Sequence, residues 1–175
     1  MNSAAYTPEK ATLLDALMAD VAAIQDKVGE TVPLVISMSA LCAAVLDSVP
    51  DIGRKLEVTN FKQGGVDLKI KAINDIPIIR VPSARMKSAY VFNDGITDGQ
   101  TGGGFKAASG AVPINWLITA RTAPIAVSKT EKIRIFTPEQ NQSADAWQID
   151  YRKYHDLWIM DNKTDVIMAN KGASD

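Results

Sequence analysis

The fold is decided by the stretch KIRIFTPEQNQSADAWQIDYRKYHDLWIMDNKTDVIMANKG, residues 132–172. Apolar and polar residues alternate along it: Trp147, Ile149 and Tyr151 share one parity, and polar residues stand between them. Successive side chains of a β-strand point to opposite faces, so this alternation predicts extended strands with one apolar face.

The pattern changes further along the same stretch. We expect the parity to slip near residues 152–155, so that Leu157 and Ile159 continue a strand on a new parity. The run Asp-Asn-Lys at 161–163 predicts a turn, and Val-Ile-Met at 166–168 predicts a returning strand. Long patterned strands without a recognisable catalytic arrangement favour a structural protein over an enzyme.

The composition narrows the possible functions. The chain has 175 residues, of which 46% are hydrophobic, and a net charge of −1. This suits a single compact domain, or a domain with an appendage. A balanced charge gives no reason to expect a strongly basic face for nucleic acid. No apolar run approaches the roughly 20 residues that cross a bilayer, and no signal peptide is recognisable. We therefore expect no membrane partner and an intracellular location.

The chain holds one cysteine, Cys42, and one histidine, His155. One cysteine excludes an internal disulfide framework, and its apolar neighbours predict a small buried side chain. This pair cannot build a His/Cys zinc site, so we expect no metal and no other cofactor. Asp156 and Ser143 lie near His155 in sequence, but no G-x-S-x-G turn is present and strand neighbours face opposite ways. We predict a structural histidine and no catalytic residue.

Two helices are expected in the first third of the chain. The run Thr-Pro-Glu at residues 7–9 predicts a helix start. Apolar residues then recur at steps of three and four until Gly29, which predicts a helix end. A buried strand is expected over residues 32–38, after which Ser39 caps a second helix over residues 40–49.

Several strands are expected in the middle of the chain. Residues 56–61 and 66–72 predict a hairpin around a Gln-Gly-Gly turn. Two prolines within residues 76–82 predict an edge strand or a strand bounded by turns. Further strands are predicted at residues 114–119 and 132–136, with a turn or short helix at 124–127.

Residues 93–112 form the one low-complexity segment, with six glycines and a single large side chain, Phe105. Such a composition predicts a long mobile loop. The run Gly-Gly-Gly-Phe-Lys at 102–106 lacks the Lys-Ser/Thr pair of a phosphate loop, and the two Asp-Gly pairs lack the spacing of a calcium loop.

The remaining polar and aromatic residues suggest a surface. Positive charges are scattered and interleaved with acidic residues, which favours a solvated face. The alternative is charge-paired contact with a neighbouring subunit. Trp116, Trp147 and Trp158 are expected in strands, as core residues or as interface anchors.

Three stretches resemble the C-terminal part of tailed-bacteriophage major capsid proteins of the Hong Kong 97 fold. They are IPIIRVPSARM at residues 76–86, INWLI at 114–118 with APIAVSK at 123–129, and RIFTP at 134–138 with YRKYHDLW at 151–158 and DNK at 161–163. The strand and helix expected over residues 32–49 also fit that family's axial domain. The family's N-terminal arm, extended loop and long spine helix are not recognisable in this sequence.

The resemblance implies an α+β fold, a Hong Kong 97-like fragment with a mixed or antiparallel sheet flanked by helices. It implies an axial-type domain over residues 1–130 that carries the mobile glycine-rich loop at 93–112. Residues 131–175 would form the closing strands, as a peripheral-type β-hairpin, or the whole chain would be one compact unit.

The resemblance also implies a function: a structural subunit of a phage or prophage icosahedral head, located in the virion capsid and, during assembly, in the host cytoplasm. Its partners would be copies of itself, as pentamers and hexamers joined by heterologous contacts, and DNA enclosed without sequence recognition. Three alternatives stay open: an encapsulin-like shell, a small enzyme with an unrecognised site, and a β-rich binding module. Candidate subunit contacts are Asp94, Phe105, Lys106, Arg152 and Lys153.

Overall fold

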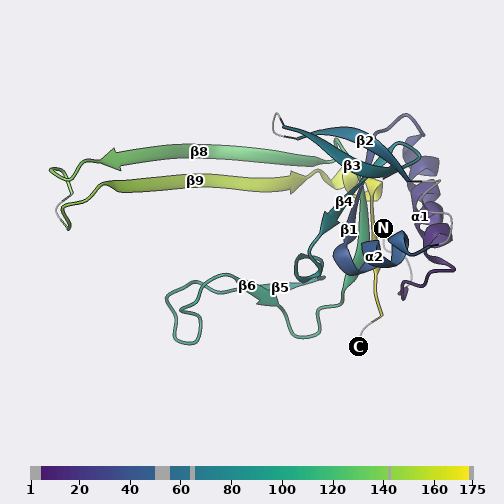
Figure 1. Cartoon of the computed structure of the whole chain (residues 1–175), viewed down its shortest axis with the longest axis horizontal. Coiled ribbons are helices and arrows are strands. Elements are labelled where there is room, and N and C mark those ends of the chain that lie inside the picture. Colours follow the sequence, from purple (N-terminus) through teal and green to yellow (C-terminus); the bar gives the residue numbers. More distant parts are fainter. Residues whose placement is uncertain (1–4, 50–55, 64–65, 142, 174–175) are drawn as a thin grey trace. The chain divides into compact units, whose positions relative to one another are not determined.

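The computed structural model of the chain describes residues 5–49, 56–63, 66–141 and 143–173 (Figure 1). Its helices and mixed sheets belong to the α+β class that the sequence predicts. The chain divides into two compact units. The first runs to Ala123 and resumes at Asn162, and the second is the intervening segment Pro124–Asp161.

The first unit is built on a six-stranded sheet in the order β10-β7-β1-β4-β3-β2. β1 and β4 are parallel and the other neighbouring pairs are antiparallel, so the sheet is mixed. The predicted hairpin and the two predicted buried strands are confirmed as β2–β3, β1 and β7. The strands are β1 (Leu34–Ser39), β2 (Leu56–Gln63), β3 (Val66–Ile73), β4 (Ile76–Val81), β7 (Ile114–Ala120) and β10 (Ile167–Lys171).

Two helices, α1 (Leu13–Val28) and α2 (Ala40–Asp47), share one hydrophobic core with this sheet. Residues of α1 at steps of three and four are buried, as the apolar stripe predicts. Gly29 ends α1 with a φ of 84°, a conformation that glycine adopts without steric cost. Within the described residues no helix is long and apolar enough to cross a membrane.

The start of α1 differs from the prediction. The helix begins at Leu13 and not at the Thr-Pro-Glu run. The residues before it form no helix: the Tyr6 amide donates to the Lys171 carbonyl of β10 at 2.9 Å, and residues 10–12 form a turn. The Leu13 amide then bonds to the Glu9 carbonyl at 2.9 Å and starts the helical turn. A long-range backbone hydrogen bond thus overrides a local capping signal.

The start of α2 follows the prediction. The Ser39 hydroxyl accepts a hydrogen bond from the Cys42 amide at 3.3 Å, which is the N-cap that the sequence predicts. Cys42 is buried, also as expected. The helix ends at Asp47, two residues before the predicted end, and the proline expected to close it lies outside the described residues.

The proline-containing strand β4 lies inside the sheet, between β1 and β3, so the predicted edge position is wrong. Pro77 is tolerated there because it is paired on one side only. It pairs with Ala72 of β3, whereas the pairing of β4 with β1 starts at Ile78. The alternative, a strand bounded by turns, is confirmed. Asn74 precedes β4 with a positive φ of 48°, and the 3₁₀ helix η1 (Ser83–Arg85) follows it.

Residues 93–112, predicted as a long mobile loop, contain a strand. β6 (Phe105–Ala107) pairs with β5 (Tyr90–Phe92) in an antiparallel two-stranded sheet of the first unit. Composition alone missed it because Phe105 finds its partners outside the glycine-rich segment. Its ring centroid lies 5.4 Å from that of Tyr90, in an edge-to-face arrangement.

The second unit is an antiparallel ribbon of two long strands, β8 (Pro124–Phe136) and β9 (Gln148–Ile159), visible as the green and yellow pair in Figure 1. The turn or short helix predicted at residues 124–127 is wrong, because those residues begin β8 and pair with β9. The predicted boundary between residues 130 and 131 falls inside β8, since the two strands pair along their whole length.

The ribbon has a register shift, but not at residues 152–155 where the slip in parity was predicted. The register shifts between Ser128 and Thr130 of β8, which makes Lys129 the extra residue of a β-bulge. β9 alternates without interruption, so Leu157 and Ile159 share a face with Ile149. The slip expected in β9 is therefore wrong.

The segment after β9 returns to the first unit. The turn predicted at residues 161–163 is the start of a 3₁₀ helix, η2 (Asp161–Val166). The returning strand is confirmed as β10, and it pairs with β7 at the edge of the six-stranded sheet.

Candidate assembly surfaces

The β8–β9 ribbon has no core of its own. None of its described residues is buried, and eleven of the thirteen β8 residues and all twelve β9 residues are exposed. An isolated two-stranded hairpin is marginally stable in water, because it buries too little apolar surface to offset its ordering. This unit therefore needs a covering surface that its own residues do not supply.

One face of the ribbon is apolar near the tip. Ile133 faces Tyr151 across the strands, and Ile135 faces Ile149. These four side chains, here called the apolar quartet, are 56–68% exposed. Large apolar side chains gathered in this way mark an interaction site more often than a solvated surface.

A charged rung adjoins the quartet on the same face. Glu131 stands opposite Lys153, and their side chains form an ion pair of 3.8 Å between Lys153 Nζ and Glu131 Oε2. The Tyr151 hydroxyl donates to Glu131 Oε1 at 3.0 Å, and this hydrogen bond raises the pKa of Tyr151. The apolar quartet and this rung together form the mating face of the ribbon.

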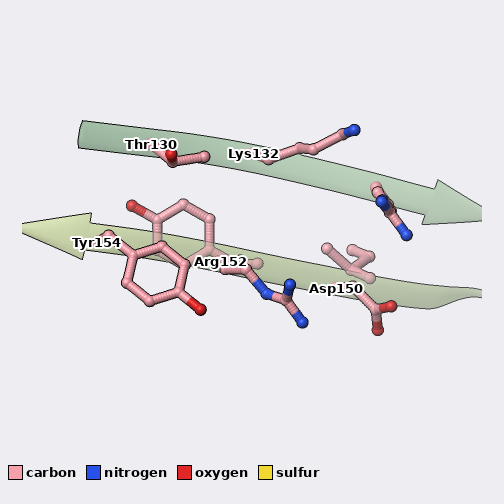
Figure 2. Close-up of a pocket in the computed structure, with 8 residues that line it drawn as sticks. Thr130, Lys132, Asp150, Arg152 and Tyr154 are labelled. Atoms are coloured by element: carbon pink, nitrogen blue, oxygen red, sulfur yellow. The ribbon is translucent and has the colours of Figure 1, made fainter. Parts of the chain in front are cut away.

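Over the same stretch of the ribbon, residues 130–134 and 150–154, the opposite face is polar and mostly cationic, and is here called the charged face. Figure 2 shows its side chains rising from both strands. Together with the edges of Ile149 and Tyr151 they line an open hollow of about 460 Å³. Three cations and one carboxylate give it a local positive charge, although the net charge of the chain is −1. Its residues are Thr130, Lys132, Arg134, Asp150, Arg152 and Tyr154.

A second exposed surface lies on the β5–β6 ribbon. Phe92 faces Phe105 across the strands and is 74% exposed. The three aromatic rings of this ribbon and Arg85 line an open hollow of about 350 Å³. Tyr90 and Phe92 were not predicted from the sequence as part of this surface. The signal that could have found them is their spacing of two residues, which places both on one face of a strand, the face that meets Phe105.

The structure distributes the five predicted contact residues over both ribbons. Asp94, Phe105 and Lys106 belong to the β5–β6 ribbon and its connecting loop, whereas Arg152 and Lys153 belong to β9. Arg152 and Lys153 are neighbours on a strand and point to opposite faces. Arg152 therefore joins the charged face and Lys153 the mating face.

Asp94 organises its own loop. Its carboxylate accepts hydrogen bonds from the Thr97 hydroxyl and from the amides of Ile96 and Thr97. These donors lower the pKa of Asp94 to about 2. The Asn93 amide also donates to the Gly104 carbonyl at 2.9 Å and closes the loop at its base. The loop expected to be mobile is thus hydrogen-bonded within itself.

Two of the three tryptophans are exposed. Trp116 is fully buried in β7, whereas Trp147 and Trp158 are 66% and 62% exposed. Trp147 precedes β9 and lies outside any strand, which differs from the prediction. The exposed pair favours the interface role that the sequence left open for tryptophan.

The histidine lies on the ribbon. His155 faces Ser128 across the strands, while Asp156 accepts hydrogen bonds from the Leu157 amide at 2.8 Å and from Trp158 Nε1 at 2.9 Å. Asp156 is thus engaged away from His155. Burial raises the pKa of the Cys42 thiol to about 12, which keeps it protonated near neutral pH. Within the ranges that the structure describes, no group of three His, Cys, Asp or Glu residues could hold a metal ion.

A polar cluster that sequence reasoning missed lies in the first unit. Asn115 Nδ2 donates to Asn170 Oδ1 and to the Tyr6 carbonyl, both at 2.8 Å. Trp116 Nε1 donates to Asp20 Oδ2 at 2.9 Å. These bonds join α1, β7, β10 and the segment before α1, and they hold the strands from which the ribbon departs.

No protein-family model matches the chain, and no curated protein matches it either.

Proposed function

We propose that the chain is a structural subunit that mates with copies of itself to form a closed shell. The observation that carries this proposal is the β8–β9 ribbon, a long unit without a buried residue that presents paired large apolar side chains. Such a unit gains stability only when another surface covers it. In a shell, every subunit has neighbours whose surfaces can cover its β8–β9 ribbon.

We assign the shell to a phage or prophage head, and the chain to its major capsid protein with a Hong Kong 97-like fold. The support is the resemblance to that family of residues 76–86, of 114–118 with 123–129, and of 134–138 with 151–158 and 161–163. The first stretch forms β4 with η1, and the second forms most of β7 and the start of β8. The third lies at the end of β8, in the second half of β9 and at the start of η2. The resemblance therefore falls on the sheet and on the ribbon that needs a partner.

The working state of the protein is then the assembled shell. Subunits meet around five-fold and six-fold axes through heterologous contacts, so different surfaces must match. The aromatic surface around Phe105 is our candidate for one such contact. The shell encloses DNA without reading its sequence. The protein is located in the virion capsid, and in the host cytoplasm during assembly.

The proposal is tested by expressing the chain alone and examining the purified protein by negative-stain electron microscopy and light scattering. We expect closed particles of uniform size. Particles that protect nucleic acid from nuclease support a phage head, and particles that hold only cargo protein indicate an encapsulin-like shell. A stable monomer at every concentration refutes self-assembly and favours a binding module.

The contact assigned to the β5–β6 ribbon has its own test. Phe92 and Val91 are neighbours on β5, and they face Phe105 and Lys106 respectively. We expect Phe92→Ser to reduce particle yield and Val91→Ser to leave it close to that of the unchanged chain. Hydrogen exchange at residues 93–112 should also slow in the particles. Equal exchange in particles and free subunits removes this ribbon from the contact.

A further inference from the structure

We propose that the mating face of the β8–β9 ribbon packs against the same face of a second copy, about a two-fold axis that runs along the strands. This inference rests on the proposed self-assembly and names one of its contacts. Two ribbons packed in this way form a small β-sandwich, in which two sheets lie about 10 Å apart and their inner side chains interdigitate.

The register of the ribbon determines which residues meet. A two-fold axis parallel to the strands places β8 of one copy over β9 of the other, at the same height. Each residue of β8 then faces, in the second copy, the same β9 residue with which it is paired in its own ribbon. Ile133 faces the second copy's Tyr151, and Ile135 faces its Ile149, so apolar side chains cover apolar side chains.

Charge selects this arrangement over its alternatives. With the axis along the strands, Glu131 faces the Lys153 of the second copy, and both rungs are matched. The alternative is a two-fold axis between the ribbons that is perpendicular to the strands. At this rung it places Glu131 over the second copy's Glu131 and Lys153 over its Lys153, which is repulsive. It also places Ile133 and Tyr151 over the polar rung of Ser128 and His155.

An axis across the strands at the quartet itself gives no better match. It lays the quartet over the quartet, but the charged rung then projects beyond the last paired rung, Phe136 with Gln148, and faces no strand. Only the axis along the strands covers the quartet and pairs the charges at once. The contact is isologous, and closed icosahedral shells contain two-fold axes at which such contacts fit.

The charged face stays on the outside of this sandwich. Arg134 and Arg152 point away from the mating face, since they alternate with Ile133, Ile135 and Tyr151 along the strands. The sandwich therefore carries positive charge on both outer surfaces. This arrangement accounts for the apolar and the cationic face near the tip of the ribbon, although both are exposed in a single copy.

Charge-reversal substitutions at Glu131 and Lys153 test this contact. The association of the variants in solution is measured by analytical ultracentrifugation. Glu131→Lys leaves two lysines in the rung, and Lys153→Glu leaves two glutamates. We expect each variant alone to associate at least about tenfold more weakly than the unchanged chain. Mixing the two variants should restore association, because opposite charges then face each other between copies. Within each ribbon the like charges remain, so a purely intrachain role predicts no recovery.

A matched pair of substitutions tests the face itself. Ile135 and Arg134 are neighbours on β8, and threonine suits a strand at both positions. We expect Ile135→Thr to weaken association by about tenfold or more, and Arg134→Thr to leave it nearly unchanged. Equal effects of the two variants, or no recovery on mixing the charge variants, overturn the inference.

The two proposals fail separately. If closed particles form and the Ile135→Thr and Glu131→Lys chains assemble as the unchanged chain does, the ribbon contact is wrong and the shell function stands. If the chain forms dimers that respond to these substitutions but never forms particles, the ribbon contact stands and the shell function is wrong.

Discussion

The buried indole of Trp116 offers the sharpest test of what holds the first unit together. Its side chain is fully buried, and Nε1 donates to Asp20 Oδ2 at 2.9 Å. Its ring centroid also lies 5.6 Å from that of Tyr6, in an edge-to-face arrangement. Trp116→Phe keeps an aromatic ring at the site but removes the hydrogen bond and part of the volume.

The magnitude follows from these contacts. Loss of a hydrogen bond to a charged acceptor costs about 1.5–3 kcal/mol. The unfilled volume adds about 1 kcal/mol, because the surrounding side chains collapse only in part. We therefore expect Trp116→Phe to lower the free energy of unfolding by about 2.5–4 kcal/mol, which is a large fraction of the stability of a small domain.

The second tryptophan–aspartate pair is a matched control. Trp158 Nε1 donates to Asp156 Oδ2, also at 2.9 Å, but the Trp158 side chain is 62% exposed. The donor and acceptor are the same, but this bond is exposed and joins residues only two apart, in β9 of the second unit. Because water replaces the lost partner at an exposed site, we expect Trp158→Phe to change the free energy of unfolding by less than about 0.5 kcal/mol.

The assay is urea denaturation followed by far-ultraviolet circular dichroism, which does not depend on the substituted indole. Asp20→Ala in both the unchanged and the Trp116→Phe backgrounds completes a double-mutant cycle. We expect a coupling energy of about 1 kcal/mol or more, since both substitutions remove one shared bond. Equal losses from Trp116→Phe and Trp158→Phe, or zero coupling, would refute the argument.

Three further predictions concern single residues of the first unit. Lys71 of β3 and Arg80 of β4 lower the pKa of Asp47 below its ordinary 3.8. The contribution of Asp47 to stability is therefore fully present well above pH 3.8 and is lost as the pH falls through the lowered pKa. The stability difference between the unchanged chain and Asp47→Asn, followed by denaturation across pH, should be constant well above pH 3.8 and shrink below it. The Cys42 thiol, with its pKa raised to about 12, should resist iodoacetamide in the folded chain and react when urea unfolds it, as mass spectrometry would detect; rapid labelling in the folded chain contradicts its burial. Gly172→Ala places a Cβ 2.7 Å from Cγ of the rigid Pro113 ring and should lower the melting temperature, at a cost of about 1–3 kcal/mol, whereas Gly102→Ala meets no atom within 4 Å and serves as the control.

Much of the first unit could be predicted from local sequence. The apolar steps of α1, the glycine that ends it and the Ser39 cap of α2 act over a few residues, and the structure places them as expected. The alternation around Ile149 and Tyr151 likewise predicts an extended strand with one apolar face. These signals are local because they depend on backbone geometry and on the period at which side chains recur.

The candidate surfaces were only partly predictable. The five predicted contact residues all lie in or beside the two ribbons, and strand alternation alone separates Arg152 from Lys153. The sequence could not tell which β8 residues stand opposite them, because that depends on the cross-strand register, which Lys129 shifts by one residue in β8. The aromatic surface around Phe105 was missed because its partners in β5 lie outside the glycine-rich segment.

The sequence by itself determined the α+β class, the main strands and the division of the last third into an apolar and a polar pattern. Only the tertiary structure decided that β4 lies inside the sheet, that β10 returns to pair with β7, and that β8 pairs with β9 in a two-stranded ribbon with a bulge at Lys129. The reason is physical. Propensity and periodicity act between residues close in the chain, whereas strand order and burial depend on which distant segments compete for the same backbone and apolar partners.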